Sequence, residues 1–173
     1  MSKSSKKSTP GEGSKTTQAA DAKGQLAGFL AKFTPEVAGQ AEATLRHMRK
    51  LYPTALELVY DNYNALAIGF GPTEKVSEVI FSIAVYPRWV SLFFLQAQRL
   101  PDPGKILKGS GNVAKHVVLT SLDVLKEPAV KALMLEAESR ARVLFDPRGK
   151  HRLIIKSISA KQRPRRPVEG RKR

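Results

Sequence analysis

The sequence predicts one α+β domain in which N- and C-terminal helices cover an antiparallel sheet of about five strands. Near both ends of the chain, apolar residues recur at spacings of three and four, which is typical of amphipathic helices. Between these helices lie short runs of β-branched and aromatic residues separated by turn residues, which is typical of strands. With 173 residues, the chain has the length of a single domain with one core.

Two helices are expected before the strands. Residues 1–22 are rich in Ser, Lys, Thr and Gly and have almost nothing to bury, so we expect a disordered basic tail. In residues 25–33, four apolar side chains share one helical face and predict a short helix: Leu26, Phe29, Leu30 and Phe33. Thr34 and Pro35 then form an N-cap and a first-turn proline, and an apolar stripe predicts a second helix as far as Tyr52.

Strands are expected at 58–63, 66–70, 76–86, 89–95 and 115–120. Pro87 and Arg88 leave room only for a tight turn, so the third and fourth strands should form an antiparallel hairpin at the centre of the sheet. Both faces of the fourth strand are apolar, with Trp89 and Phe93 on one of them. We therefore expect helices on one face and a ligand groove on the other.

The C-terminal part has one further helix and a basic end. Pro128 opens a helix whose apolar stripe continues to Leu144, and it should end at 146–149. Residues 153–158 are compatible with an edge strand or an extended arm, and residues 160–173 should be a disordered tail rich in Arg and Lys. The expected domain therefore covers residues 23–159.

The net charge of +15 is concentrated at the C-terminal end. Residues 148–173 contain eleven basic side chains and one acidic side chain, whereas residues 24–147 carry a net charge of only +2. A nearly neutral domain with a cationic extension predicts that the extension binds nucleic acid or another polyanion. The residues that would contact phosphates are Lys161, Arg163, Arg165, Arg166, Arg171, Lys172 and Arg173. A solvated tail without a ligand is the alternative.

Three segments of the chain resemble the YdhG-like family, a bacterial domain group mostly of unknown function. They are residues 85–94 (VYPRWVSLFF), residues 100–103 (LPDP) and residues 107–111 (LKGSG) continuing into 115–117 (KHV). The resemblance covers about residues 35–145 and implies an α+β fold with helices over an antiparallel sheet. One branch of the family is described as frataxin-like intracellular iron chaperones, so the resemblance also implies iron as a cargo.

Two features predict a ligand region. Trp89 and Phe93 are either core residues or a platform on which nucleic-acid bases stack. Gly109 and Gly111 are either part of a flexible turn or an anion-binding nest of backbone amides. The other residues expected around these two features are Lys105, Lys108, Lys115 and His116.

The sequence contains no recognisable motif for catalysis or metal binding. The chain has no cysteine, its three histidines are widely separated, and Ser110 lacks the context of a nucleophile elbow. We therefore predict no catalytic residue, no metal ligand and no cofactor other than the iron that the resemblance implies. No apolar run approaches the length of a membrane span, and we expect a cytoplasmic protein.

The sequence thus favours a non-enzymatic binding or accessory protein of YdhG-like type. A frataxin-like iron chaperone and a non-specific binder of nucleic acid or anions are the alternatives. Iron delivery would use grouped carboxylates, but Glu36 and Glu42 lie on different faces of their helix beside several cations.

Overall fold

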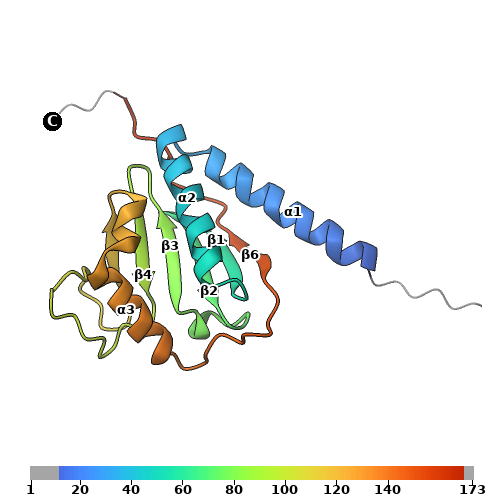
Figure 1. Ribbon diagram of the computed structural model, residues 1–173. Helices are drawn as coiled ribbons and strands as arrows, with labels where there is room; N and C mark the ends of the chain where they lie inside the picture. Colours follow the sequence, from blue (N-terminus) through green and yellow to red (C-terminus); the bar gives the residue numbers. More distant parts are fainter. Residues whose placement is uncertain (1–11, 170–173) are drawn as a thin grey trace, which may run out of the picture.

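The computed structural model describes residues 12–169 and shows an α+β fold with three helices on one face of a six-stranded sheet (Figure 1). The helices are α1 (Glu12–Ala31), α2 (Pro35–Leu51) and α3 (Pro128–Ser139). The strands are β1 (Leu56–Asp61), β2 (Leu66–Gly71), β3 (Phe81–Val85), β4 (Val90–Phe94), β5 (Lys115–Leu119) and β6 (Arg152–Ile158). Two short 3-10 helices, η1 (Val76–Glu78) and η2 (Leu122–Lys126), lie in the connections. The predicted fold class is confirmed.

The sheet has the strand order β5-β4-β3-β2-β1-β6. Strands β1 to β5 pair antiparallel with their neighbours, whereas β6 runs parallel to β1 at the edge. The predicted hairpin is present, since Val85 pairs with Val90 and the Tyr86 amide donates to the Trp89 carbonyl at 2.9 Å. For residues 153–158, the position of β6 beside β1 at the edge of the sheet shows the edge strand and not the extended arm.

The main core lies between the sheet and the helices. Alternate residues of β3 and β4 point toward α2 and are fully buried, and among them Phe81 and Phe94 meet edge to face with ring centroids 5.7 Å apart. Helix α2 begins as expected, with the Thr34 hydroxyl accepting from the Val37 amide, and it buries Val37, Leu45 and other residues of the predicted stripe. Such burial of apolar side chains is the main stabilising contribution to the fold.

Helix α1 is longer than the sequence pattern predicts, because it begins at Glu12, inside the segment expected to be disordered. Its C-terminal half is anchored by Leu26, Phe29 and Leu30, which pack in the main core. Extending an existing helix costs much less free energy than nucleating one, so the anchored half supports further turns toward the N-terminus. Residues 18–21 of these turns are exposed. Residues 1–11 lie outside the described part of the chain.

Helix α3 is shorter than predicted and ends at Ser139 instead of 146–149. Past this end, the Arg142 amide donates to the Gln96 side chain at 3.0 Å rather than to a helical carbonyl. The chain then turns back, and Phe145 packs on Tyr52 with ring centroids 5.0 Å apart. Leu144, which the helical pattern placed in the apolar stripe, is exposed.

The described part of the C-terminal segment, residues 160–169, packs against the domain, although its composition predicts disorder. The cause is Arg165, which is only 5% exposed. Its Nη2 lies 2.8 Å from Oδ1 of the buried Asp61, and its guanidinium group lies over the Phe33 ring. Composition cannot reveal this contact, because the partner carboxylate is 104 positions away in the sequence.

We expect two glycine-to-alanine substitutions to have opposite effects on stability. A Cβ at Gly71 in β2 would lie 3.1 Å from the backbone of Val79, so Gly71→Ala should lower the free energy of unfolding by about 1–3 kcal/mol. A Cβ at Gly39 in α2 would meet nothing within 4 Å, so Gly39→Ala should raise it by about 0.5–1 kcal/mol. Urea denaturation measures both values, and equal effects of the two substitutions would contradict this packing.

Candidate functional site

The face of the sheet opposite the helices presents three of the residues that the sequence predicts for a ligand region. Alternation along β4 and β5 places Trp89, Phe93 and His116 on this face, while Leu92 and Val117 point into the main core. None of the described helices contributes to the small apolar cluster on this side, which consists of Leu56, Leu58 and Val79 with Tyr60, Leu95 and Ile154 packed against it. Trp89 is 43% exposed, so it is not a core residue.

Two stacked aromatic pairs lie on this face. The Tyr86 and Trp89 rings stack with centroids 4.9 Å apart and planes inclined by 23°. The Phe93 and His116 rings stack at 4.8 Å and 24°. Burial lowers the pKa of His116, and the charge of Lys108 lowers it further, which favours the neutral ring near pH 7. The stacking face, as we call it below, is defined by Tyr86, Trp89, Phe93 and His116.

Small side chains continue the stacking face across the sheet. Ser91 of β4 stands opposite Ala84 of β3, and Phe93 stands opposite Ser82. The Ser91 hydroxyl is buried and has no hydrogen-bond partner among the described residues. Neither the cavity between α1, α2 and β6 nor the one beside residues 95–98 is lined by a residue of the stacking face, so neither of them is the groove expected on this face.

The glycine-rich loop lies at the edge of the stacking face. Lys108 and His116 exchange two backbone hydrogen bonds of 2.7 and 2.9 Å, and a Cβ at Gly109 would lie 3.6 Å from the His116 ring. A carboxylate of the loop itself already occupies two of its backbone amides, because Asp102 accepts hydrogen bonds from the amides of residues 106 and 107. These two amides are therefore not free for an external anion.

The remaining predicted loop residues do not converge on the stacking face. Lys105 and Gly111 are exposed in the loop. Lys115 pairs with Phe94, a core residue, so the strand alternation directs Lys115 to the side opposite His116. The predicted cluster of three lysines around the glycines is therefore divided between two faces.

Among the predicted phosphate-contacting residues, Lys161, Arg163 and Arg166 are exposed, whereas Arg165 is buried against Asp61. The guanidinium group of Arg163 lies 5.5 Å from the centroid of the Tyr63 ring, in the turn between β1 and β2. This turn and the β3–β4 turn lie at the same end of the sheet, because Leu66 pairs with both Asp61 and Val85. Arg171, Lys172 and Arg173 lie outside the described residues.

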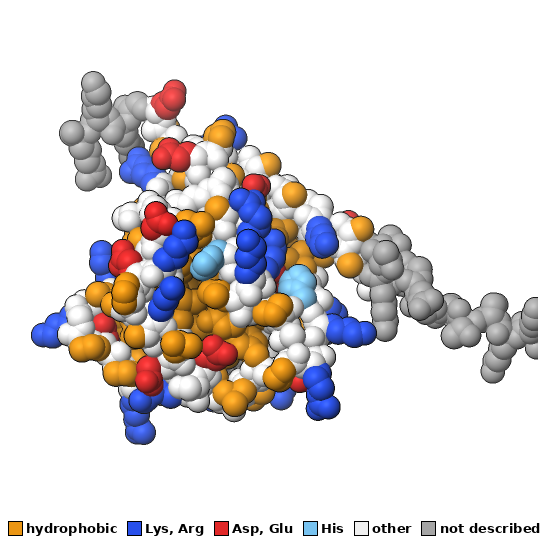
Figure 2. Space-filling view, in the orientation of Figure 1, with side chains coloured by type: hydrophobic (Ala, Val, Ile, Leu, Met, Phe, Trp, Pro, Cys, Tyr) orange, Lys and Arg blue, Asp and Glu red, His pale blue; other side chains and the backbone are white. Residues whose placement is uncertain are grey.

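The helix side also carries a basic surface, which Figure 2 shows as Lys and Arg side chains on both sides of the C-terminal half of α2. Within it, burial lowers the pKa of His47, and the charges of Lys126, Lys50 and Lys131 lower it further. Cationic side chains therefore surround His47 on this side of the molecule.

A cluster that the sequence did not reveal lies between α2, β1 and the segment leading into β6. Glu57 of β1 has a fully buried side chain. Arg49 binds it through two hydrogen bonds of 2.6 and 2.8 Å, and His151 Nε2 lies 2.7 Å from Oε1. Burial raises the pKa of Glu57, but the hydrogen bonds from Arg49 and His151 outweigh it and hold the pKa below its ordinary value.

One signal in the sequence could have indicated Glu57. It lies two residues before Val59 and four before Asp61 in the first strand, so these three residues share one face. Since Val59 belongs to the core, Glu57 requires cationic partners there. Arg49 lies in the last turn of α2, where a cation is usually exposed and interacts with the helix dipole, so its role here depends on the packing of α2 on the sheet.

The described residues contain no group of three or more histidine, cysteine and acidic side chains placed to hold a metal ion. The oxygens of Asp61 are engaged by Lys32 at 2.9 Å and by Arg165 at 2.8 Å. None of the helices in the described residues is both long and apolar enough to cross a membrane.

Comparison with known proteins found no matching family model, no matching curated protein and no matching solved structure. Membership of the YdhG-like family therefore stays a prediction.

Proposed function

We propose that the protein is a non-enzymatic binding protein of YdhG-like type whose ligand is single-stranded nucleic acid, bound on the stacking face. The observation that carries this proposal is the presence of two ring pairs, Tyr86–Trp89 and Phe93–His116, on a sheet face that none of the described helices covers. Unpaired bases stack on aromatic side chains presented by a sheet, and such stacking contributes about 1–3 kcal/mol per base.

The spacing of the rings supports a single strand as the ligand. Trp89 and Phe93 are four residues apart along extended backbone, which separates their Cα atoms by about 13 Å. Ser91, which lies between them on this face, is fully buried, so the rings themselves and not the sheet surface between them are the groups that a strand can contact. Bases inside a duplex are already stacked on each other and cannot use these rings without being unpaired.

Cationic side chains near the stacking face support an anionic ligand. Lys108 is next to His116, and Arg88 is exposed in the turn that presents Trp89. Arg163 and Lys161 lie in the segment packed at the same end of the sheet as that turn. Neutralisation of phosphates by such residues releases counterions, so the affinity should fall steeply as salt increases. An iron-chaperone role rests on the family resemblance alone.

We expect the double substitution Trp89→Ala/Phe93→Ala to weaken binding of a fluorescently labelled oligothymidylate by at least tenfold, because two stacking contacts are lost. Leu135→Ala on α3 is the control, since it removes an exposed apolar side chain on the other side of the sheet. Fluorescence anisotropy at two salt concentrations measures the affinities. Equal affinities of the two variants would refute the proposal.

The contribution of residues 160–173 to nucleic-acid binding is best tested by single substitutions. Deleting residues 160–173 would also remove Arg165 and expose the buried Asp61, so the effect on binding could not be separated from a loss of stability. Arg163→Met should weaken oligothymidylate binding and make the dependence of affinity on salt shallower. An unchanged salt dependence would exclude Arg163 from the interface.

A further inference from the structure

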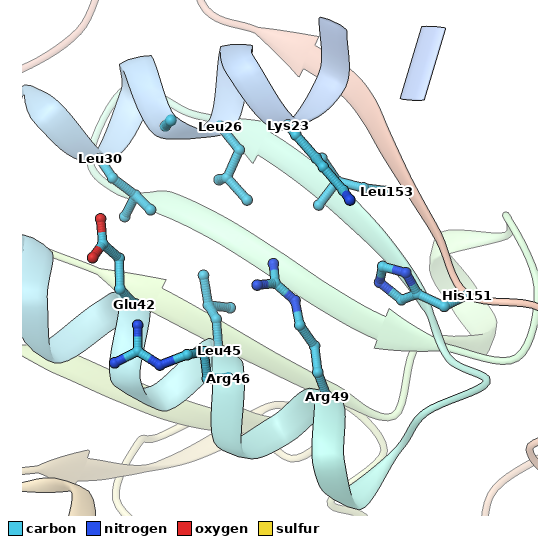
Figure 3. Close-up of a pocket in the computed structure, with 10 residues that line it drawn as sticks. Lys23, Leu26, Leu30, Glu42, Leu45, Arg46, Arg49, His151 and Leu153 are labelled. Carbon is cyan, nitrogen blue, oxygen red and sulfur yellow. The ribbon is translucent and has the colours of Figure 1, made fainter. Parts of the chain in front are cut away.

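A cavity with a volume of about 520 Å³ lies on the helix side, between α1, α2 and β6. Figure 3 shows Leu26 and Leu30 pointing into it from α1 and Leu45 from α2, with Leu153 of β6 at one end. Cavities that bind small organic molecules have volumes of about 300–1,000 Å³ and mostly apolar walls. This cavity therefore has the size and lining of a small-molecule site.

Its polar groups are mainly cationic. Lys23 of α1 and Arg46 and Arg49 of α2 line the cavity with His151, and Glu42 is the only acidic residue in the lining. Glu57 lies beneath and pairs with Arg49, so the charges of these two residues offset each other. Lys23 and Arg46 then leave an excess of positive charge over Glu42 at the opening.

Arg49 is held in place by Glu57. Its Nε and Nη2 bind the two oxygens of Glu57, and this bidentate pairing fixes the plane of the guanidinium group. Nη1 takes no part in that pairing. Figure 3 shows the Arg49 guanidinium group and the His151 ring on one side of the cavity, with Lys23 reaching toward them from α1. A buried carboxylate that orients an arginine beside an apolar cavity is an arrangement suited to recognising an anionic head group.

We infer that this cavity binds a small amphipathic carboxylate, with the carboxylate at Arg49 and Lys23 and an alkyl or aryl tail against the leucines. The leucine walls exclude a purely hydrophilic anion as the best ligand, since burial of an apolar tail against them adds to the affinity. The cations disfavour a neutral or positively charged head group. Because the cavity and the stacking face lie on opposite sides of the sheet, binding at each can be measured separately.

Calorimetric titration of the full chain with octanoate tests the inference. We expect saturable binding with one site, and weaker binding of both octan-1-ol, which lacks the charge, and acetate, which lacks the tail. Equal binding of octan-1-ol, equal binding of acetate, or no saturable binding of octanoate would each overturn the inference.

Substitutions inside and outside the lining test whether octanoate binds in this cavity. Lys23→Met/Arg46→Met removes two exposed cations and leaves the Glu57 pairing intact, and it should weaken octanoate binding about tenfold or more. Ala27→Trp fills the cavity from an exposed position of α1 and should abolish binding. Lys50→Met, an exposed residue of α2 outside the lining, should have no effect. Wild-type affinity in the first two variants would exclude the cavity as the site.

Discussion

Replacing Arg165 with methionine should lower the free energy of unfolding by about 3 kcal/mol or more. Removing one partner of a buried ion pair leaves the other charge without compensation, which typically costs 3–5 kcal/mol. Among the described residues, Asp61 would keep only Lys32 as an ionic partner, and the backbone carbonyls of Asn62 and Tyr63 would lose the guanidinium donors. For a chain of this length, the melting temperature should fall by about 10 °C.

The control is Arg166→Met, which changes the neighbouring arginine in the same way. Arg166 is exposed and binds only the carbonyl oxygens of Ala31 and Lys32 among the described residues, so its loss should cost less than about 1 kcal/mol. Urea denaturation of both variants measures the difference. Equal stabilities would show that residues 160–169 do not pack on the domain in solution.

Replacing Glu57 with glutamine should lower the free energy of unfolding by about 2–3 kcal/mol at pH 7. Glutamine has nearly the same size, but its amide group can accept through only one oxygen and directs N–H donors toward Arg49 and His151. The cost is smaller than for Arg165 because the Arg49 side chain is 38% exposed and can reach water. Glu42→Gln, an exposed change on α2, should alter stability by less than about 0.5 kcal/mol.

The effect of Glu57→Gln should depend on pH. The pKa of Glu57 is lower in the folded protein than its ordinary value of 4.5, so the carboxylate stabilises the fold above pH 4.5. This contribution is lost as the pH falls below 4.5 and passes through the folded-state pKa. The difference in stability between wild type and variant should therefore shrink between pH 7 and pH 3. A constant difference would contradict the ion pairing of Glu57.

Local patterns predicted most of the fold. The Thr34–Pro35 start of α2, the tight turn at Pro87–Arg88 and the alternation in β4 depend on neighbouring residues, and all three are present in the structure. Local sequence patterns gave wrong predictions where contacts between residues far apart in the sequence determine the structure. Helix α3 ends early because Gln96 takes the Arg142 amide, and the C-terminal segment is ordered because Arg165 meets Asp61.

For the candidate sites too, the features that depend on neighbouring residues could be predicted, and those that depend on distant contacts could not. Trp89 and Phe93 were predicted to share a face because strand alternation is local, but their exposure depended on where the helices pack. Lys115 was misplaced because adjacent residues of β5 point to opposite faces. The cavity could not be predicted, since its walls come from α1, α2 and β6 and are brought together only by the fold.

Trp89 provides the most direct measurement of the central claim, because it is the only tryptophan in the chain. Adding oligothymidylate to the wild-type protein should quench its fluorescence, with the same concentration dependence as the anisotropy titration, because a base stacks on the exposed indole ring. Octanoate should leave the emission unchanged, since its cavity lies on the other side of the sheet. Oligonucleotide binding without any change in Trp89 emission would contradict binding on the stacking face.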